Sequence, residues 1–193
     1  MKFRSKQNQS ARERIVSAMM ELIREKPMSR ISVQELTERA GVSRMTFYRN
    51  YSSREDVFLS RIQDILDCYR QDDLERELTG RFYDKERIQH GFSYFFQYRE
   101  FVSALIYCGF SDVFLKELTE FALKKWLVDA QNLPEQYRLV SFVGIMFNSY
   151  LRWIQEPQSL TLEELTDLVF SICEGAYGVD TEKGYTTDCN KIC

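Results

Sequence analysis

Residues 32–51 read SVQELTERAGVSRMTFYRNY, and this stretch decides the fold of the N-terminal part of the chain. Ser32 and Glu35 have the spacing of a capping box, in which the serine hydroxyl accepts a hydrogen bond from the amide three residues later. Gly41 is a typical helix stop, and Ser43 is a second typical N-cap. The stretch therefore predicts two short helices joined by a tight turn at Gly41.

The second of these helices is predicted to have a buried face and an outward face. Phe47 and Tyr51 are four residues apart, so both can pack into one core. The layout is that of a helix-turn-helix, whose second helix enters the major groove of DNA. On the outward face, arginine can bind guanine, threonine and methionine can contact a thymine methyl group, and a tyrosine hydroxyl can reach phosphate. Helix N-termini with free backbone amides also favour phosphate. The candidate DNA-binding residues are Ser32, Ser43, Arg44, Met45, Thr46, Tyr48, Arg49 and Arg54.

Helical signals continue on both sides of this stretch. A capping box at Ser10–Glu13 predicts an earlier helix that ends near Lys26, and Ser52 or Ser53 is predicted to begin a fourth helix. Beyond residue 72, helices are predicted at about 84–98, 99–108, 111–131, 135–156 and 161–177, the last with a capping box of its own. Only three prolines and eight glycines interrupt the chain, so the expected fold class is all-α.

The composition excludes several classes of protein. The 193 residues are 44% hydrophobic and 28% charged, which is ordinary for a globular protein. Five cysteines without a CxxC pair and a single histidine argue against a disulfide framework, a metal site and common hydrolytic catalysis, so no cofactor is expected. The longest uncharged apolar stretch, residues 139–151, is too short to cross a bilayer. No apolar segment follows the basic N-terminus, so the expected location is the cytoplasm.

Charge is distributed unevenly along the chain. Residues 1–62 contain 13 Lys and Arg against 7 Asp and Glu, whereas residues 63–193 contain 13 against 22. A basic end on an acidic protein is expected where that end meets a polyanion.

The run from Ile31 to Phe58, with its elements AGVS, TFYRNY and SREDVF, resembles the DNA-binding domain of the tetracycline-repressor (TetR) family. The resemblance extends from Ala11 to Ile62. It implies a three-helix DNA-binding head at residues 1–62 and a larger helical body at residues 63–179 that binds an effector and forms a homodimer. The implied partner of the head is a palindromic double-stranded DNA operator. Residues 180–193 are polar and are predicted to be a disordered tail.

Three positions depart from the usual family pattern. Met45 stands where a small residue or proline is usual, which leaves the base preference open. Thr37 replaces a usual alanine, and Arg54 stands where a lysine more often contacts phosphate.

Residues 82–153 contain 18 of the chain's 27 aromatic residues. So many rings can fill a core, and together they also suit an apolar ligand cavity between helices. His90 and Tyr98 are candidate polar anchors for a ligand. The candidate pocket residues are Phe92, Phe96, Tyr98, Tyr107, Phe114, Trp126 and Phe147.

The predicted helix at 135–156 is apolar on two faces. A helix that is apolar all round is buried, either within its own chain or partly against a second subunit. The family resemblance favours the second arrangement, because the last two helices commonly form the dimer interface. The candidate interface residues are Phe142, Met146, Trp153, Leu165, Leu168 and Ile172.

These observations predict a homodimeric transcriptional regulator without enzymatic activity, a repressor released from its operator by an apolar or aromatic small molecule. Two alternatives stay open. One is an activator that works through a protein co-effector, and the other is a small helical enzyme or ligand-binding protein in which the helix-turn-helix serves only for packing.

Overall fold

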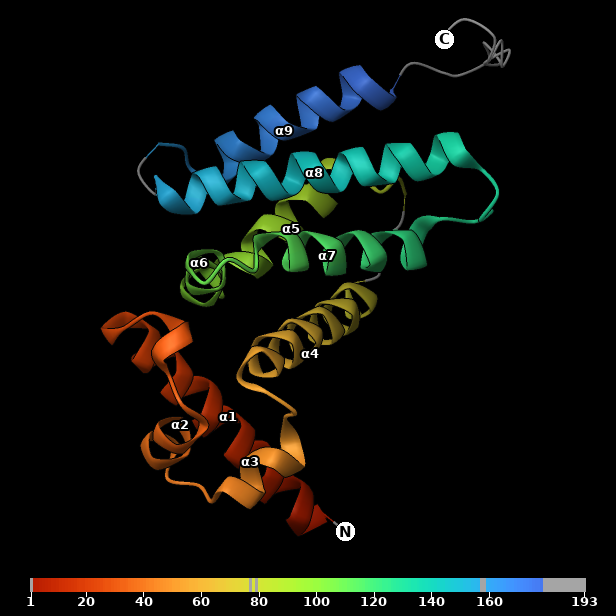
Figure 1. Ribbon diagram of the computed structural model, residues 1–193. Helices are drawn as coiled ribbons and strands as arrows, with labels where there is room; N and C mark the ends of the chain where they lie inside the picture. The colour runs from red at the N-terminus through yellow and green to blue at the C-terminus, as the bar shows by residue number, and fades with distance from the viewer. Residues whose placement is uncertain (1, 77, 79, 157–158, 179–193) are drawn as a thin grey trace, which may run out of the picture.

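The computed structural model describes residues 2–76, 78, 80–156 and 159–178. Over these residues the structure has only helices and their connections, which confirms the predicted all-α class (Figure 1). The predicted tail at 180–193 lies outside the described residues. The elements are α1 (Lys2–Glu25), the 3-10 turn η1 (Met28–Arg30), α2 (Val33–Ala40), α3 (Arg44–Asn50), α4 (Arg54–Glu75), α5 (Lys85–Phe96), α6 (Arg99–Tyr107), α7 (Ser111–Trp126), α8 (Leu133–Gln155) and α9 (Leu162–Tyr177).

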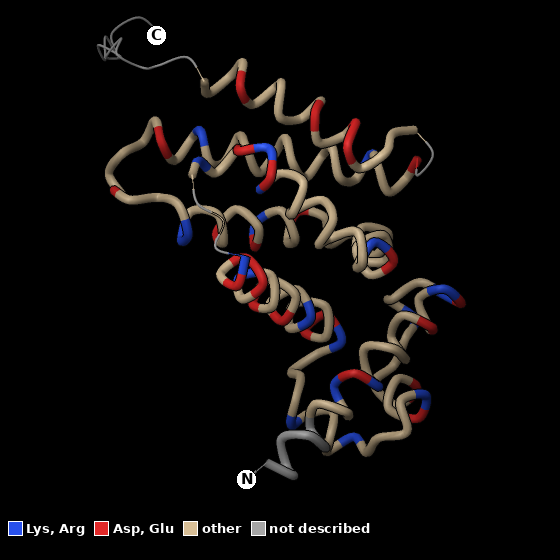
Figure 2. The backbone as a smooth tube through the Cα atoms, turned by 180° about the vertical axis from the view of Figure 1, so that it is seen from behind, with Lys and Arg blue, Asp and Glu red and all other residues tan. Residues whose placement is uncertain are grey.

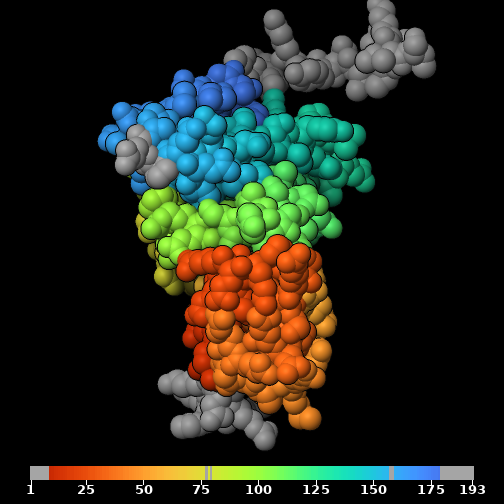
Figure 3. Space-filling model, turned by 60° about the vertical axis from the view of Figure 1, so that its left-hand side comes forward, coloured from red at the N-terminus to blue at the C-terminus, as the bar shows by residue number. Residues whose placement is uncertain are grey.

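The helices form two stacked parts along the long axis of the molecule (Figures 1 and 3). Helices α1 to α3 form the head at one end, and α4 leads from it to the body. In the body α8 packs between α7 and α9, while α5 packs against α9. The predicted domain boundary at residues 62/63 falls within α4, so this one helix belongs to both parts.

Several predicted helix starts are confirmed by the capping hydrogen bonds. The hydroxyls of Ser32 and Ser43 accept hydrogen bonds from the third amides of α2 and α3, at 3.1 and 3.0 Å. Thr161 and Glu164 form the complete capping box at the start of α9. Gly41 ends α2 with φ of 62°, a left-handed conformation that glycine adopts without strain.

Two predicted boundaries are wrong. The first helix begins at Lys2, so Ser10 lies inside α1 and does not cap it. Residues 2–9 contain no proline or glycine, and nothing in them stops the helix from extending. The helix predicted at 111–131 ends at Trp126, because Leu127 is extended and Asp129 accepts a hydrogen bond from the Gln131 amide in the following turn.

One apolar core runs through both parts. The Phe47 side chain is fully buried and Tyr51 is 2% exposed, as the four-residue spacing predicted. Where the head meets the body, the ring centroid of Phe58 on α4 lies 5.8 Å from that of Phe101 and 5.5 Å from that of Phe110. These contacts connect the start of α4 to the α6 end of the body.

Candidate functional site

The turn between α2 and α3 has a defined geometry. The Gly41 amide donates to the Glu38 carbonyl at 3.1 Å, and the Val42 amide donates to the Thr37 carbonyl at 3.0 Å. Arg14 on α1 donates to the Gly41 carbonyl at 3.1 Å. These bonds fix the direction in which α3 leaves the turn, so α1 and α2 together position α3.

Helix α3 presents a polar and unusually exposed face to solvent. Met45 is 82% exposed and Tyr48 is 59% exposed, although both are large side chains. Arg44 and Arg49 are exposed as well, and Arg44 donates to the Gln34 side chain of α2 at 2.6 Å. The buried Phe47 sets this orientation, because a helix with one face anchored in the core must turn its other face outward. Arg44, Met45, Tyr48 and Arg49 therefore share one accessible surface with the half-buried Thr46.

Arg54 begins α4 and contacts the chain that enters α2. Its guanidinium donates to the Met28 carbonyl at 3.0 Å and to the Ile31 carbonyl, and it lies 3.6 Å from the Glu55 carboxylate. Arg54 thus ties the first turn of α4 to the chain that enters α2, a role that the sequence did not indicate. Ser32 and Ser43, the N-caps of α2 and α3, are also exposed.

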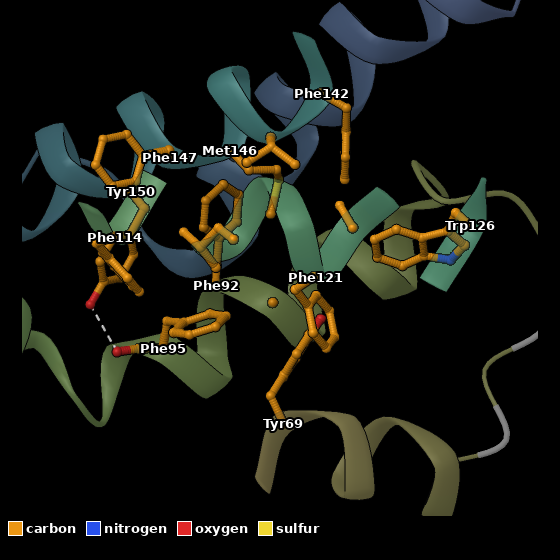
Figure 4. Close-up of a pocket in the computed structure, with 14 residues that line it drawn as sticks. Tyr69, Phe92, Phe95, Phe114, Phe121, Trp126, Phe142, Met146, Phe147 and Tyr150 are labelled. Carbon is orange, nitrogen blue, oxygen red and sulfur yellow. Dashed lines mark hydrogen bonds between the residues drawn. The ribbon is translucent and has the colours of Figure 1, made fainter. Parts of the chain in front are cut away.

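The body encloses a cavity of about 80 Å³ between α4, α5, α7 and α8 (Figure 4). Its wall is almost entirely aromatic and aliphatic. The Tyr150 hydroxyl donates to the Phe95 carbonyl at 2.8 Å, so it has a partner in the wall. The lining residues are Tyr69 from α4; Gly91, Phe92 and Phe95 from α5; Phe114, Leu118, Phe121, Ala122 and Trp126 from α7; and Phe142, Val143, Met146, Phe147 and Tyr150 from α8.

Four of the seven candidate pocket residues line this cavity: Phe92, Phe114, Trp126 and Phe147. The other three do not. Phe96 packs against Trp153, with ring centroids 4.7 Å apart, and Tyr107 is 72% exposed at the end of α6. Tyr98 lies in a separate polar groove, which Asp72 and His90 also line.

His90 is also not a ligand anchor in the cavity. Its Nε2 atom lies 2.5 Å from an Asp72 carboxylate oxygen, and its ring stacks on Tyr69 with centroids 4.9 Å apart. Hydrogen bonds from Arg76 and His90 lower the pKa of Asp72. The imidazole is thus held between Asp72 and the Tyr69 ring, and His90 is not among the residues that line the cavity.

Comparison with known proteins agrees with this architecture. Residues 15–60 match the family model described as "Bacterial regulatory proteins, tetR family", a range that covers all of the candidate DNA-binding residues. The chain has the TetR-family transcriptional regulator fold. A search among curated proteins gave no match to the sequence.

Solved structures of TetR-family regulators superpose on most of the chain. A TetR transcriptional regulator from Streptococcus agalactiae 2603V is 21% identical, with a TM-score of 0.60 over 89% of this chain and 97% of that one. A TetR-family protein from Syntrophomonas wolfei is 21% identical, with a TM-score of 0.62 over 91% and 99%. The dihydroxyacetone kinase operon activator DhaS is 15% identical, with a TM-score of 0.58 over 88% and 97%.

Within this TetR-family fold, a buried cluster of charges holds α4 against α5 and α7. Asp73 on α4 is 4% exposed and accepts hydrogen bonds from Arg87, at 2.9 Å, and from Lys125. Arg87 also donates to the Leu78 carbonyl at 2.6 Å. Both cations lie over the Trp126 ring, 5.5 and 4.8 Å from its centroid. Burial lowers the pKa of Lys125, and Asp73 opposes that shift. The cluster therefore joins the cavity wall to α4.

Three of the six candidate interface residues, Phe142, Trp153 and Leu165, are buried inside the chain, which corrects their assignment. Phe142 and Met146 line the cavity. Trp153 is 8% exposed and donates to the Leu160 carbonyl at 2.8 Å, and Leu165 is 4% exposed. Much of the apolar surface of α8 is covered by α5, α7 and α9, although Val140 is 43% exposed.

An apolar surface remains open on α8 and α9, and it includes the candidate interface residues Leu168 and Ile172. Leu168 is 52% exposed, Ile172 is 47% exposed and Val140 is 43% exposed. Gly144 and Gly175 belong to the same two helices, and a Cβ atom added at either would meet nothing within 4 Å. We call these five residues the α8–α9 face.

Charge differs between the two ends of the molecule. Within its described range α9 carries Glu163, Glu164, Asp167 and Glu174 but no Lys or Arg, whereas α3 carries Arg44 and Arg49 and no acidic residue (Figure 2). In the described part of the chain, no helix is both long and apolar enough to span a membrane.

Proposed function

We propose that this protein is a homodimeric, sequence-specific transcriptional regulator of the cytoplasm, a repressor that a small apolar molecule releases from a palindromic operator. The outward face of α3 is the observation that carries the proposal. Arg44, Met45, Thr46 and Arg49 face the bases, while Ser32, Ser43, Tyr48 and Arg54 face the phosphates. Exposing Met45 and Tyr48 to water contributes nothing to folding, and both side chains suit a DNA groove.

Selection of bound sequences from random duplex DNA tests the DNA-binding proposal. We expect one palindromic motif, because a two-fold dimer presents two identical α3 helices to half-sites about one helical turn apart. A folded protein that enriches no motif would falsify the proposed function.

Replacing Arg49 with alanine is expected to weaken operator binding by about 1–3 kcal/mol and to relax base preference at one position in each half-site. The reason is the loss of a bidentate contact to a base edge. The measurement is a binding titration against the selected operator and single-base variants of it.

Arg39→Ala is the matched control for Arg49→Ala. Arg39 is on α2, and its guanidinium bonds both oxygens of Glu25 at 2.8 and 3.1 Å on α1. The Arg39→Ala substitution removes the same charge as Arg49→Ala but removes no contact to a base, so base preference should be retained. Equal loss of preference in both variants would show that Arg49 does not read bases.

The homodimer is proposed to form through the α8–α9 face. This face lies at the far end of the molecule from α3, so two copies can join there with both heads free (Figure 1). Its exposed leucine and isoleucine supply apolar area, and its two glycines allow helices to approach closely.

The effector is proposed to occupy the cavity in the body. Tyr69 belongs both to the cavity wall and to α4, the helix that begins at the head. A ligand shifts the equilibrium between DNA-binding arrangements only if it binds one of them more tightly, and a tenfold release requires about 1.4 kcal/mol of preference.

An activator is the second candidate, because one structure with this fold is that of an operon activator. The two functions differ in the effect of deleting the gene. Loss of a repressor raises transcription from promoters that carry the selected motif, whereas loss of an activator lowers transcription from them.

A further inference from the structure

One tyrosine of the cavity wall, Tyr69, has a hydroxyl that is available for a new hydrogen bond. Tyr69 is 6% exposed, and its side chain rises from α4 into the cavity toward Phe121 (Figure 4). Among the described residues, no hydrogen bond to its hydroxyl is formed, and burial raises the pKa of this phenol well above its usual value. The other tyrosine of the wall, Tyr150, is bonded to the Phe95 carbonyl. The Tyr69 hydroxyl can therefore bond a group that enters the cavity.

A glycine leaves space beside this hydroxyl. Gly91 lies in the interior of α5, where glycine costs about 1 kcal/mol relative to alanine. A Cβ atom there would lie 3.6 Å from the Tyr69 hydroxyl oxygen and 3.3 Å from the Met146 methyl carbon. The space that the glycine leaves is therefore part of the cavity between these two atoms.

Size and charge restrict what this space accepts. The cavity volume of about 80 Å³ is smaller than that of an engineered cavity of about 150 Å³ that binds benzene. Met146 can widen it, because an unbranched methionine changes rotamer readily. None of the described residues that line the wall is charged, and the nearby Arg87 and Lys125 are already paired with Asp73. A charged ligand would lose its hydration without gaining a counter-ion.

We propose that the cavity binds a neutral molecule with a single aromatic ring and one hydroxyl, amine or carbonyl group, and that this group hydrogen-bonds the Tyr69 hydroxyl. This inference rests on the proposed ligand response and specifies its site. Because Tyr69 belongs to α4, the bond is made directly to the helix that carries the head.

Phenol and toluene are the matched probes, since they have the same shape and differ in one hydrogen-bonding group. Calorimetric titration of the full chain without DNA gives the ratio of their dissociation constants. In Tyr69→Phe we expect phenol to lose about tenfold in affinity relative to toluene, because its hydroxyl is left unsatisfied. Tyr94→Phe is the control, and it should keep the wild-type ratio because Tyr94 lies outside the set of residues that line the cavity and its hydroxyl donates to the Ile65 carbonyl at 3.1 Å.

A second variant tests the space independently of the hydroxyl. Gly91→Ala places a methyl group in the cavity and should weaken both probes at least roughly tenfold, the effect of one added methylene in a filled pocket. A thermal unfolding measurement of Gly91→Ala checks that this variant retains the fold. Binding of neither probe to the wild type, or an unchanged ratio in Tyr69→Phe, overturns the inference. Either result leaves the DNA selection unaffected, so failure here is distinguishable from failure of the regulator proposal.

Discussion

Replacing Asp73 with asparagine is expected to lower the free energy of unfolding by about 3–5 kcal/mol, the usual cost of removing one partner from a buried ion pair. Asp73 is the acceptor for both Arg87 and Lys125. Without this charge the Arg87 side chain, 6% exposed, loses its buried counter-ion, and its hydrogen bond to the Leu78 carbonyl does not replace that charge. Among the described residues the Nε atom of Arg87 has no hydrogen-bond partner even in the wild type, so the neutral variant leaves a poorly solvated cation.

Chemical denaturation at a fixed protein concentration measures this effect. Asp67→Asn is the control on the same helix, because Asp67 pairs with Arg70 at 3.0 Å while both side chains are more than half exposed. An exposed pair contributes little, about 0–1 kcal/mol. If the two variants were equally stable, the buried cluster would have no special role in holding α4.

Replacing Ile172 with glutamate is expected to dissociate the homodimer and to reduce operator affinity at least about a hundredfold, or about 2.7 kcal/mol. In a two-fold interface each substitution occurs twice, so two unpaired charges are buried together. The Ile172 side chain is about half exposed in the single chain, so the fold itself should tolerate the change.

Analytical ultracentrifugation and an operator titration test this second prediction. The control is Leu74→Glu, which places the same charge at a 63% exposed position on α4, away from the α8–α9 face. A wild-type protein that is monomeric at micromolar concentration would exclude the proposed interface. A dimer that persists in Ile172→Glu would place the interface elsewhere.

Local signals predicted the head well. The serine caps determine where α2 and α3 begin, and Gly41 determines where α2 ends. The pair Phe47 and Tyr51 determines which face of α3 is buried. Each of these features acts within about one turn of helix. The same locality explains the confirmed capping box at Thr161. Such features are readable in sequence since they need no knowledge of distant residues.

The body was harder to predict because its partners come from distant segments. An apolar pattern shows that the faces of α8 are buried, yet it does not say whether α5, α7 and α9 or a second subunit covers them. Tyr69 was missed because it precedes the aromatic-rich segment. Asp73 did leave a signal, since Ile62, Leu66 and Tyr69 continue at helical spacing to this acidic residue.

The contacts of Arg54 limit how any signal can reach DNA. Its guanidinium bonds the carbonyls of Met28 and Ile31, so the first turn of α4 and the chain entering α2 are joined. Arg12 adds a second link between α1 and Asp64 on α4 at 2.7 Å. The head is thus attached to α4 at two points, so we expect a displacement of α4 to carry α1 to α3 with it. In the proposed dimer, the quantity that such a displacement would change is the separation between the two heads.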